Sequence, residues 1–284
     1  LSQSDTSPAS ETGEIKGLWL VATNPMSSMP TPPRIRKAME NLEFLVVQDV
    51  YEDVETNKYS HVYFPAAVWA EKEGCHTNTE RRVNLTRNVL PAYADSKPDF
   101  WIFNEMSKRF EDRNKIHFPP TAEGAFNEMR ELSKGAGRTL DISGMSYDRI
   151  EAARGIQWPY SEEQAKRDAQ AIGESNGLDM LSRKLYLGDP RLYTNGHFQT
   201  PDGRANLLPI RFINNNECPD SEYPFWLNSG RVVEHFHTRT RTGKIGNCNK
   251  FSPTPYMEMN PDEADELGIE HQSYVRLVSR RGDA

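Results

Sequence analysis

The sequence predicts an α/β fold, in which a parallel sheet with a helical insertion is followed by the start of a C-terminal β-barrel. Three observations predict it. Apolar runs of strand length alternate with helical stretches near the N-terminus, helical periodicity dominates the middle, and short apolar runs between turn residues fill the last part of the chain.

The N-terminal region predicts three strands. The first covers residues 15–22 and ends in a turn, and the second covers residues 44–47 after a helix over residues 34–41. A third strand is expected over residues 61–64, after a short helical turn. This order is typical of a parallel sheet with right-handed crossovers.

Polar residues follow the first two strands directly. Asn24 comes after the first, and Gln48 and Asp49 close the second. Parallel sheets bind ligands at the carboxyl ends of their strands, so these side chains are candidates for ligand contacts. Asp99 offers a further carboxylate for a purine base or a ribose. The sequence contains no GxGxxG motif, so the usual nicotinamide-dinucleotide fingerprint is absent.

The middle of the chain is predicted to be mainly helical. Residues 69–90 are charged and predict a solvated loop that runs into a helix. Residues 98–130 have helical periodicity, and residues 142–172 predict irregular and helical connections. We expect one face of the first helical stretch to pack in the core through its bulky residues, Phe100, Trp101, Phe103 and Met106.

The C-terminal part is predicted to be β-rich. An Asn-Gly and a Pro-Asp-Gly sequence within residues 193–208 predict hairpins. Further short strands are expected at residues 225–227, 232–233, 256–258 and 274–279. A helix over residues 261–267 should be capped by Asn260 and stopped by Gly268. A small barrel would begin near residue 221, and the sequence offers no closing strands for it.

Composition excludes several classes of protein. The net charge of -7 argues against a nucleic-acid surface, and no apolar run approaches the roughly 18 residues that span a bilayer. The three cysteines form no CxxC pair, so they predict neither an iron-sulfur cluster nor a zinc knuckle. An odd cysteine number without a signal peptide fits a reducing compartment, and we expect a cytoplasmic protein without a membrane partner.

The stretch from Ser229 to Thr238 combines a Ser-Gly-Arg turn with a glutamate and two histidines. Ser229-Gly230-Arg231 follows an apolar run, and such a turn can present N–H groups and a guanidinium to a diphosphate or can be an ordinary turn. If the next residues are extended, His235 and His237 share one face of the strand and Glu234 lies on the other.

Three interpretations of these histidines stay open. They can ligate zinc with a third residue, they can each bond to a carbonyl in a structural role, or they can donate hydrogen bonds to a polar ring system. No Ser/His/Asp or Cys/His arrangement indicates a nucleophile.

Taken in order, six segments resemble one family. They are similar to the second half of the molybdopterin oxidoreductases that carry two guanine dinucleotides, and the order and spacing match across nearly the whole chain. DISGMSYDRI followed by RGIQWPY is most similar to assimilatory nitrate reductases, with formate dehydrogenases and periplasmic nitrate reductases as close relatives. The six segments are IKGLWLVATNP, FLVVQDVYEDVETNKYSHVYFPAA, WAEKEGCHTNTERR, GHFQTPDGRA, SGRVVEHFHT and MNPDEADELGI.

The resemblance implies a domain plan. Residues 1–105 would form part of a Rossmann-like α/β domain that binds molybdopterin, and residues 106–220 a helical and hairpin connection. Residues 221–284 would begin a dinucleotide-binding barrel of the double-psi type.

The resemblance also implies roles by position. One group would bind one guanine dinucleotide, namely Asn24, Gln48, Asp49, Lys72 and Asp99. A second group, on the family's C-terminal loop, would contact pyrophosphates and pterins, namely Ser229, Gly230, Arg231, Glu234, His235, His237 and Thr238. The cluster cysteines and the molybdenum ligand of the family have no counterpart in this sequence, so no catalytic residue and no metal ligand is assigned.

The activity implied is the reduction of nitrate to nitrite at molybdenum held by bis-molybdopterin guanine dinucleotide. Electrons would come through a [4Fe-4S] cluster in an N-terminal part of the parent protein, from ferredoxin, flavodoxin or an NADH-linked subunit. Within the same family the alternative is a formate dehydrogenase alpha subunit, and outside it a non-catalytic dinucleotide-binding module. The chain by itself is expected to be inactive.

Overall fold

A computed structural model describes residues 10, 12–110, 118–135, 140–174, 187–215 and 217–283. The chain forms two compact units, which meet in the sequence between Leu207 and Leu208. We call them unit 1 and unit 2 and describe each by itself. The domain boundaries expected from the sequence, at residues 105 and 220, stay predictions.

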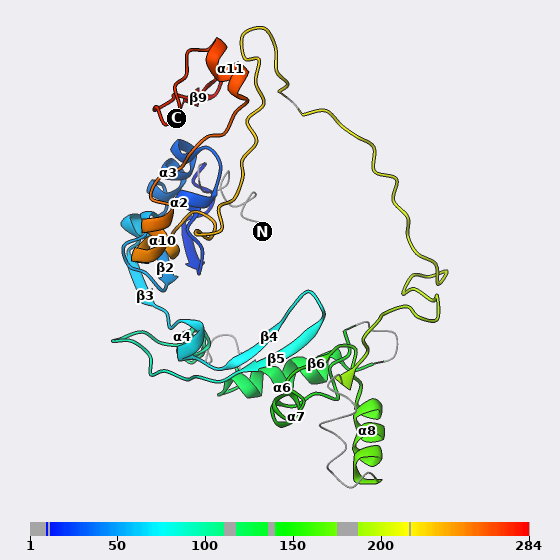
Figure 1. Ribbon diagram of the computed structural model, residues 1–284. Coiled ribbons are helices and arrows are strands. Elements are labelled where there is room, and N and C mark those ends of the chain that lie inside the picture. Colours follow the sequence, from blue (N-terminus) through cyan, green and yellow to red (C-terminus); the bar gives the residue numbers. More distant parts are fainter. Residues whose placement is uncertain are drawn as a thin grey trace. The chain divides into compact units, whose positions relative to one another are not determined.

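Unit 1 contains the expected parallel sheet. Its strands are β1 (Gly17–Val21), β2 (Phe44–Asp49) and β3 (Val62–Pro65), in the order β1-β2-β3. Both pairings are parallel, with Val21 opposite Gln48 and Gln48 opposite Phe64. The three strands lie side by side in Figure 1, and the predicted parallel sheet is confirmed.

Helices α2 (Pro25–Ser28) and α3 (Pro32–Glu40) connect β1 to β2, and the 3-10 turn η1 (Glu55–Tyr59) precedes β3. The predicted helix over residues 34–41 is therefore confirmed with a shift of one or two residues. Proline stands at the start of both helices, where its missing N–H costs nothing.

Both faces of this sheet are covered. Leu20, Leu45 and Val47 pack against Ile35 and Met39 of α3 on one face. Because side chains alternate along a strand, the neighbouring positions point the other way. On that second face the ring of Trp19 lies 5.2 Å from the ring of Phe103, which belongs to α4 (Asp99–Ser107). The sheet therefore separates α3 from α4, as expected for parallel strands.

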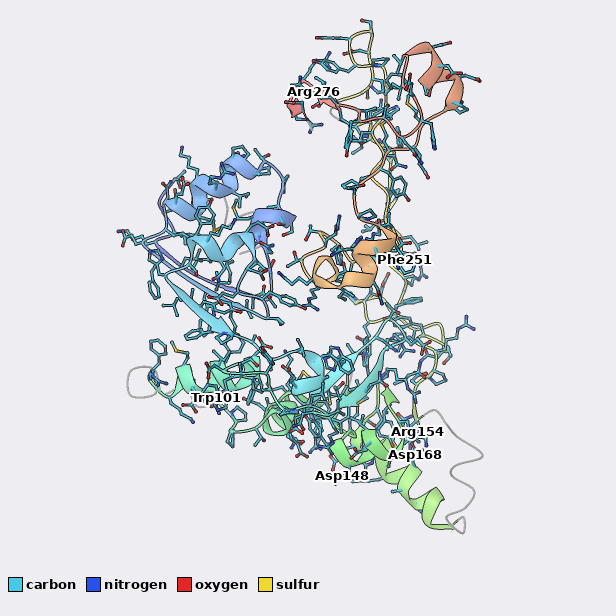
Figure 2. The ribbon with its side chains drawn as sticks, turned by 60° about the vertical axis from the view of Figure 1, so that its left-hand side comes forward. Trp101, Asp148, Arg154, Asp168, Phe251 and Arg276 are labelled. Carbon is cyan, nitrogen blue, oxygen red and sulfur yellow. The ribbon has the colours of Figure 1, made fainter. Side chains whose placement is uncertain are left out.

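The helical stretch after residue 98 packs differently from the expectation. Ile102 is the buried apolar residue of α4, whereas Trp101 is 47% exposed. Figure 2 labels Trp101 on this helix. The prediction that Trp101 packs in the core was wrong, because its neighbours Ile102 and Asn104 occupy the buried face. Phe100, Phe103 and Met106 are partly buried.

A second core in unit 1 lies on an antiparallel hairpin. The strands are β4 (Gly74–Thr77), β5 (Arg82–Thr86), β6 (Ile156–Gln157) and β7 (Leu187–Gly188), in that order. The 3-10 turn η2 (Trp69–Glu71) precedes β4. The loop and helix expected over residues 69–90 were therefore wrong. Val83 of β5 is buried in a core that also contains Phe126 and Tyr147, so a paired strand takes the place of the expected solvated loop.

Helices α6 (Ala122–Ser133), α7 (Tyr147–Ala152) and α8 (Glu162–Glu174) belong to this region. Figure 1 shows α6 and α7 beside the β4–β5 hairpin. Phe126, Tyr147, Ile150 and Ile156 meet in its core. The helical and irregular connections predicted over residues 142–172 are thus confirmed, although Ile156 and Gln157 pair as a strand.

The turns predicted within residues 193–208 are present without their strands. The N–H of Gly196 donates to the carbonyl of Tyr193, and the N–H of Phe198 donates to the carbonyl of Gly203. Residues 189–208 contain no strand. The hairpin prediction was wrong, because the Asn-Gly and Pro-Asp-Gly sequences form local turns and no paired strands flank them.

Unit 2 contains 3-10 turn η3 (Thr242–Lys244), α10 (Gly246–Phe251) and α11 (Pro261–Glu266), with strands β8 (Val278–Ser279) and β9 (Gly282–Asp283). The Asn260 side chain accepts from the N–H of Asp262, and Gly268 has a φ of 67°, so the predicted cap and stop of α11 are confirmed. Of the predicted strands, only Val278–Ser279 is paired within residues 217–283. This part of the chain shows no barrel.

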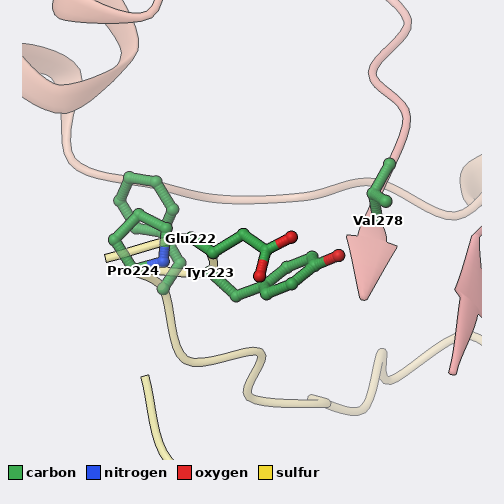
Figure 3. A pocket seen from close by; sticks show the side chains of 5 residues that line it. Glu222, Tyr223, Pro224 and Val278 are labelled. Atoms are coloured by element: carbon green, nitrogen blue, oxygen red, sulfur yellow. The ribbon is translucent and has the colours of Figure 1, made fainter. Parts of the chain in front are cut away.

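A hollow of about 340 Å³ lies within unit 2. Tyr223, Pro224 and Phe225 line one side and Val278 the other, as Figure 3 shows for the labelled side chains. Arg280 lies 4.8 Å from the centre of the Tyr223 ring and pairs with Asp220, which holds this wall in place.

None of the helices in the described ranges is both long enough and apolar enough to cross a membrane.

A side-chain staple holds the turn after β1. The Asn24 carboxamide oxygen accepts from the Thr56 hydroxyl at 2.6 Å, and its amide nitrogen donates to the Glu55 carboxylate at 2.8 Å. Ser27 donates to the same carboxylate oxygen at 2.9 Å. These bonds lower the pKa of Glu55 below its ordinary value of 4.5, the Asn24 bond contributing most.

Because the core of the parallel sheet is buried, we expect that truncating one of its side chains lowers the free energy of unfolding strongly. Leu45 is fully buried between the sheet and α3. We expect Leu45→Ala to lower the free energy of unfolding by about 2–5 kcal/mol, because the site loses apolar burial and keeps a cavity. Urea denaturation followed by circular dichroism measures it. Val89→Ala, at a residue that is 69% exposed, is the control and should change little. Equal effects of the two substitutions would contradict the assigned core.

The staple predicts a pH dependence. The folded pKa of Glu55 is lowered, so its stabilisation is present above the ordinary pKa and is lost as the pH falls through the folded value. We expect Glu55→Gln to lower the free energy of unfolding at pH 7 by on the order of 0.5–1 kcal/mol, since the group is exposed. The difference from the unchanged protein should shrink as the pH falls below 4.5 and through the lowered pKa of Glu55. Glu52→Gln is the matched control, and a difference that does not change with pH would exclude the staple as its cause.

Candidate cofactor-binding site

Three of the side chains implied by the resemblance meet at the end of β2. The amide nitrogen of Gln48 donates to one carboxylate oxygen of Asp99 at 2.7 Å, and the ammonium of Lys72 pairs with the other oxygen. Asp99 is the first residue of α4, where the helix dipole favours a negative charge. The carboxyl end of the parallel sheet therefore carries a connected amide, carboxylate and ammonium, which we call the Gln48–Asp99–Lys72 cluster.

One atom of this cluster has no partner. The Gln48 side chain is fully buried, and within the described residues its carboxamide oxygen accepts no hydrogen bond. The indole N–H of Trp19, on the same sheet face, is likewise buried without a partner. A buried polar group without a partner costs about 1–3 kcal/mol, so an acceptor held in this way suits a ligand that supplies a donor.

Asp49 lies next to the cluster and faces the other side of the sheet. Its carboxylate accepts from the N–H of Val50 at 2.6 Å, and its carbonyl accepts from the Tyr63 hydroxyl at 2.9 Å. Burial and the nearby Asp49 charge raise the pKa of Tyr63 to about 12, so this hydroxyl keeps its proton and stays a donor. Asp49 thus fixes the backbone where β2 ends.

Asn24 is close to the same edge of the sheet and is engaged in the staple described above. Its carboxamide bonds to Ser27, Glu55 and Thr56. Sequence reasoning selected Asn24 and missed Glu55 and Thr56, because nothing in the local pattern connects residues about 30 positions apart. A ligand contact by the Asn24 side chain would have to share these bonds.

In unit 2 the segment from Ser229 to Thr238 is not extended. It turns at Val233–Glu234 and again at His237–Thr238, where His237 has a φ of 48°. The alternation that placed His235 and His237 on one face therefore does not apply, and that expectation was wrong. The physical reason is that no neighbouring strand holds this segment straight.

His235 is anchored within the loop. Its Nε2 is 2.8 Å from the carbonyl of Ser252, so this nitrogen carries the proton and donates. Its Nδ1 lies 3.1 Å from the hydroxyl of Thr242, which also accepts from the N–H of Phe236 at 3.1 Å. Of the three interpretations of this histidine, the carbonyl-bonded structural role fits best. His237 instead presents its ring to the ring of Phe236, 4.1 Å away.

Other residues of the loop keep their functional groups available. Arg231 is exposed, and within the described residues its guanidinium has no hydrogen-bond or ion-pair partner. Gly230 has open space where a side chain would stand. Glu234 is half-buried and Ser229 is exposed, while the Thr238 hydroxyl lies 3.1 Å from the hydroxyl of Thr240. A turn with a guanidinium and uncovered backbone is suited to an anion.

Arg239 holds the loop together and was not selected as a site residue from the sequence. Its guanidinium donates to the carbonyl of Pro253 at 3.0 Å and to the carboxamide of Asn249 at 2.9 Å. Asn249 in turn donates to the carbonyl of Gly243 at 2.6 Å. These bonds connect the turn at His237 to α10. Figure 2 labels Phe251, the last residue of this helix.

The zinc interpretation has no support. Within the described residues, no three His, Cys, Asp or Glu side chains lie close enough together to hold a metal ion. Among the cysteines, burial raises the pKa of Cys75 to about 12, so its thiol is a poor ligand and a poor nucleophile.

Comparison with known families matches both ends of the chain. Residues 2–109 match molybdopterin oxidoreductase, and residues 225–284 match the molydopterin dinucleotide binding domain. The first match contains the Gln48–Asp99–Lys72 cluster, and the second contains the loop from Ser229 to Thr238.

Curated relatives of two activities match at similar identity. A nitrate reductase of Synechocystis is 38% identical over 96% of this chain and 36% of the relative. An F420-dependent formate dehydrogenase subunit alpha of Methanocaldococcus jannaschii is 34% identical over 95% of the chain and 35% of the relative. The assimilatory nitrate reductase catalytic subunit of Bacillus subtilis is 32% identical over 95% and 35%. The chain thus spans about a third of the length of these relatives.

Among solved structures, acetylene hydratase from Pelobacter acetylenicus matches with a TM-score of 0.64 and 16% identity, over 94% of this chain and 34% of that one. This likeness supports the fold alone. The family matches at both ends of the chain and the relatives lead to one conclusion without it: this chain is a homologue of the molybdopterin oxidoreductases.

Proposed function

We propose that this chain binds the guanine dinucleotide part of a molybdopterin cofactor through the Gln48–Asp99–Lys72 cluster. The observation that carries the proposal is the buried, unpartnered oxygen of Gln48 beside a paired carboxylate, at the carboxyl end of a parallel sheet. A guanine edge offers N–H donors next to a carbonyl acceptor. Carboxylate and carboxamide oxygens accept from such donors, and an ammonium donates to a carbonyl or a phosphate.

The residues of the cluster have separable roles in this proposal. Asp99 accepts from the base, Gln48 orients that carboxylate through its 2.7 Å bond, and Lys72 holds the other carboxylate oxygen through an ion pair. Both Asp99 oxygens are already engaged within the chain. A base that bonds to Asp99 therefore shares or displaces one of these partners, while the Gln48 oxygen accepts without displacing any partner. Asp49 fixes the backbone at the end of β2, and Asn24 stabilises the adjacent turn.

The loop from Ser229 to Thr238, in unit 2, is proposed by itself as a second cofactor-binding segment. Arg231 and the backbone at Gly230 would bind a pyrophosphate, and His237 and Glu234 would bond to pterin edges. His235 would hold the loop through Ser252 and Thr242. When bound, the cofactor supplies molybdenum redox chemistry, and the residues of this chain bind and orient it.

For the whole protein we propose the reduction of nitrate to nitrite, in which nitrate takes two electrons and two protons and releases water. The 38% identity to the Synechocystis nitrate reductase supports nitrate. Formate oxidation is the second candidate, supported by the 34% identity to the formate dehydrogenase subunit. The electrons would come from ferredoxin, flavodoxin or an NADH-linked subunit through a [4Fe-4S] cluster. A cytoplasmic location stays a prediction, since one relative is named periplasmic nitrate reductase.

The guanine proposal is tested on this chain with nucleoside diphosphates. We expect guanosine diphosphate to bind more tightly than adenosine diphosphate in isothermal titration calorimetry, because only guanine offers adjacent donors to Asp99 and Gln48. Asp99→Asn should weaken guanosine diphosphate about 10-fold or more, since a charged acceptor contributes roughly 1.5–3 kcal/mol. Asp95→Asn, at an exposed carboxylate nearby, is the control. Equal binding of the two nucleotides, or equal effects of the two substitutions, would refute the assignment.

The substrate is tested on the complete gene product, expressed with molybdate. We expect turnover of nitrate with reduced viologen as electron donor, measured as nitrite formed. Formate with oxidised viologen is the parallel assay. Turnover of formate without turnover of nitrate would replace the first candidate by the second and would leave the guanine site standing.

A further inference from the structure

The Asn-Gly sequence at residues 195–196 lies in an exposed turn of unit 1. The N–H of Gly196 donates to the carbonyl of Tyr193 at 2.9 Å, and Gly196 has a φ of 70°. Residues 193–197 are all exposed, and within the described residues a Cβ at Gly196 would meet no atom within 4 Å. Water therefore reaches this turn, and no side chain described here shields the backbone nitrogen of Gly196.

The side-chain amide of Asn195 is fixed within this turn. Its Oδ1 accepts from the N–H of His197 at 3.0 Å, which is the hydrogen bond of an Asx turn. An N–H that donates to a carbonyl oxygen stabilises the negative charge that develops on this oxygen when a nucleophile attacks the carbonyl carbon. The N–H of His197 therefore favours attack on the Cγ atom of Asn195.

We infer that Asn195 is a site of spontaneous deamidation, in which the backbone nitrogen of Gly196 attacks the Cγ atom of Asn195. The bond to the carbonyl of Tyr193 opens first, and a water molecule or hydroxide ion then takes the N–H proton of Gly196. A bond forms between this nitrogen and Cγ, the bond from Cγ to Nδ2 breaks, and the leaving NH2 group takes a proton from water to become ammonia. Water then hydrolyses the resulting succinimide at either carbonyl, which gives aspartate or isoaspartate at residue 195. No group is oxidised or reduced, and the reaction does not depend on the proposed cofactor site.

A second glycine turn in the same loop gives an internal comparison. Asp202 precedes Gly203, and an Asp-Gly sequence closes the same ring only when a protonated carboxyl loses water. The carboxylate of Asp202 accepts from the N–H of Arg204 at 3.1 Å, and this bond, together with one from Thr200, lowers the pKa of Asp202 below its ordinary value of 3.8. Gly203 is also buried, and a Cβ at this position would lie 2.5 Å from the ring of His197. Because Asp202 is ionised at neutral pH and its glycine is covered, we expect this turn to stay unmodified.

The two products change the loop in different ways. Aspartate at residue 195 adds a negative charge, whereas isoaspartate routes the backbone through the side chain and so adds a methylene between residues 195 and 196. The rings of Tyr193 and Phe198 are stacked across this turn, with their centres 4.6 Å apart. We therefore expect isoaspartate to disturb the aromatic stack that connects the two ends of the turn.

Incubation of the chain of 284 residues at mildly alkaline pH, followed by brief trypsin digestion and mass spectrometry, tests the inference. Trypsin cleaves after Arg191 and Arg204, so one peptide reports on both Asn195 and Asp202. We expect aspartate and isoaspartate to accumulate at residue 195 of the folded chain, while Asp202 stays unchanged. The chain unfolded in guanidinium chloride is the reference for the reactivity of the sequence alone. An Asn195 that converts in the unfolded chain and stays intact in the folded chain would overturn the inference, and so would isoaspartate that forms equally fast at residue 202.

Substitution of the glycine gives an independent readout. Gly196→Ala should slow the conversion of Asn195 about 10-fold or more, because a Cβ crowds the attacking nitrogen and restricts the rotation that the attack requires. Gly268→Ala is the matched control, since Gly268 has a similar φ of 67° and equally open surroundings in a different turn. It should leave the conversion of Asn195 unchanged. Equal rates in the Gly196→Ala variant and the unchanged chain would show that the Gly196 nitrogen is not the nucleophile and would overturn the inference.

Discussion

The carboxylate of Asp99 connects three elements of unit 1. It accepts from Gln48 at the end of β2, pairs with Lys72 after η2 and begins α4. Asp99 therefore fixes the helix that carries Phe103 onto Trp19 and closes the second face of the sheet. The polar contact at the first turn of α4 and the apolar packing of Phe103 on Trp19 hold the same helix against the sheet. The proposed guanine site is a consequence of this same arrangement.

The sequence predicted those parts of the molecule whose signals are local. Apolar runs of strand length gave the three parallel strands, and the Asn260-Pro261 start and Gly268 stop gave α11. Gln48 and Asp99 were candidates from the residues themselves, whereas Lys72 was selected only through the family resemblance. Periodicity could not join Gln48 to Asp99, because the two are 51 positions apart and meet only once the sheet and α4 are folded.

The failures share a physical cause. The β4–β5 hairpin was missed because its strands are short and mostly polar and lie in a charged stretch, with Arg82 and Asn84 on either side of the buried Val83. The strands expected in unit 2 were assigned from their apolar composition. A segment of that composition forms a strand only where a neighbouring strand pairs with its backbone. At His237 the backbone takes a positive φ that the pattern of alternating residues gave no reason to expect. Pairing with residues distant in sequence formed the hairpin, and the lack of such pairing left the expected strands of unit 2 unformed.

The shared carboxylate of the cluster has a thermodynamic consequence for mutagenesis. Lys72 and Gln48 both depend on Asp99, so removing Asp99 leaves an ammonium and a buried amide without their acceptor at once. Residues in one hydrogen-bonded network show coupling energies of roughly 0.5–3 kcal/mol. Single substitutions here therefore do not add, and the effect of losing Lys72 would be smaller in a protein that already lacks Asp99. Gln48, Lys72 and Asp99 therefore contribute to stability as one coupled unit rather than as three independent contacts.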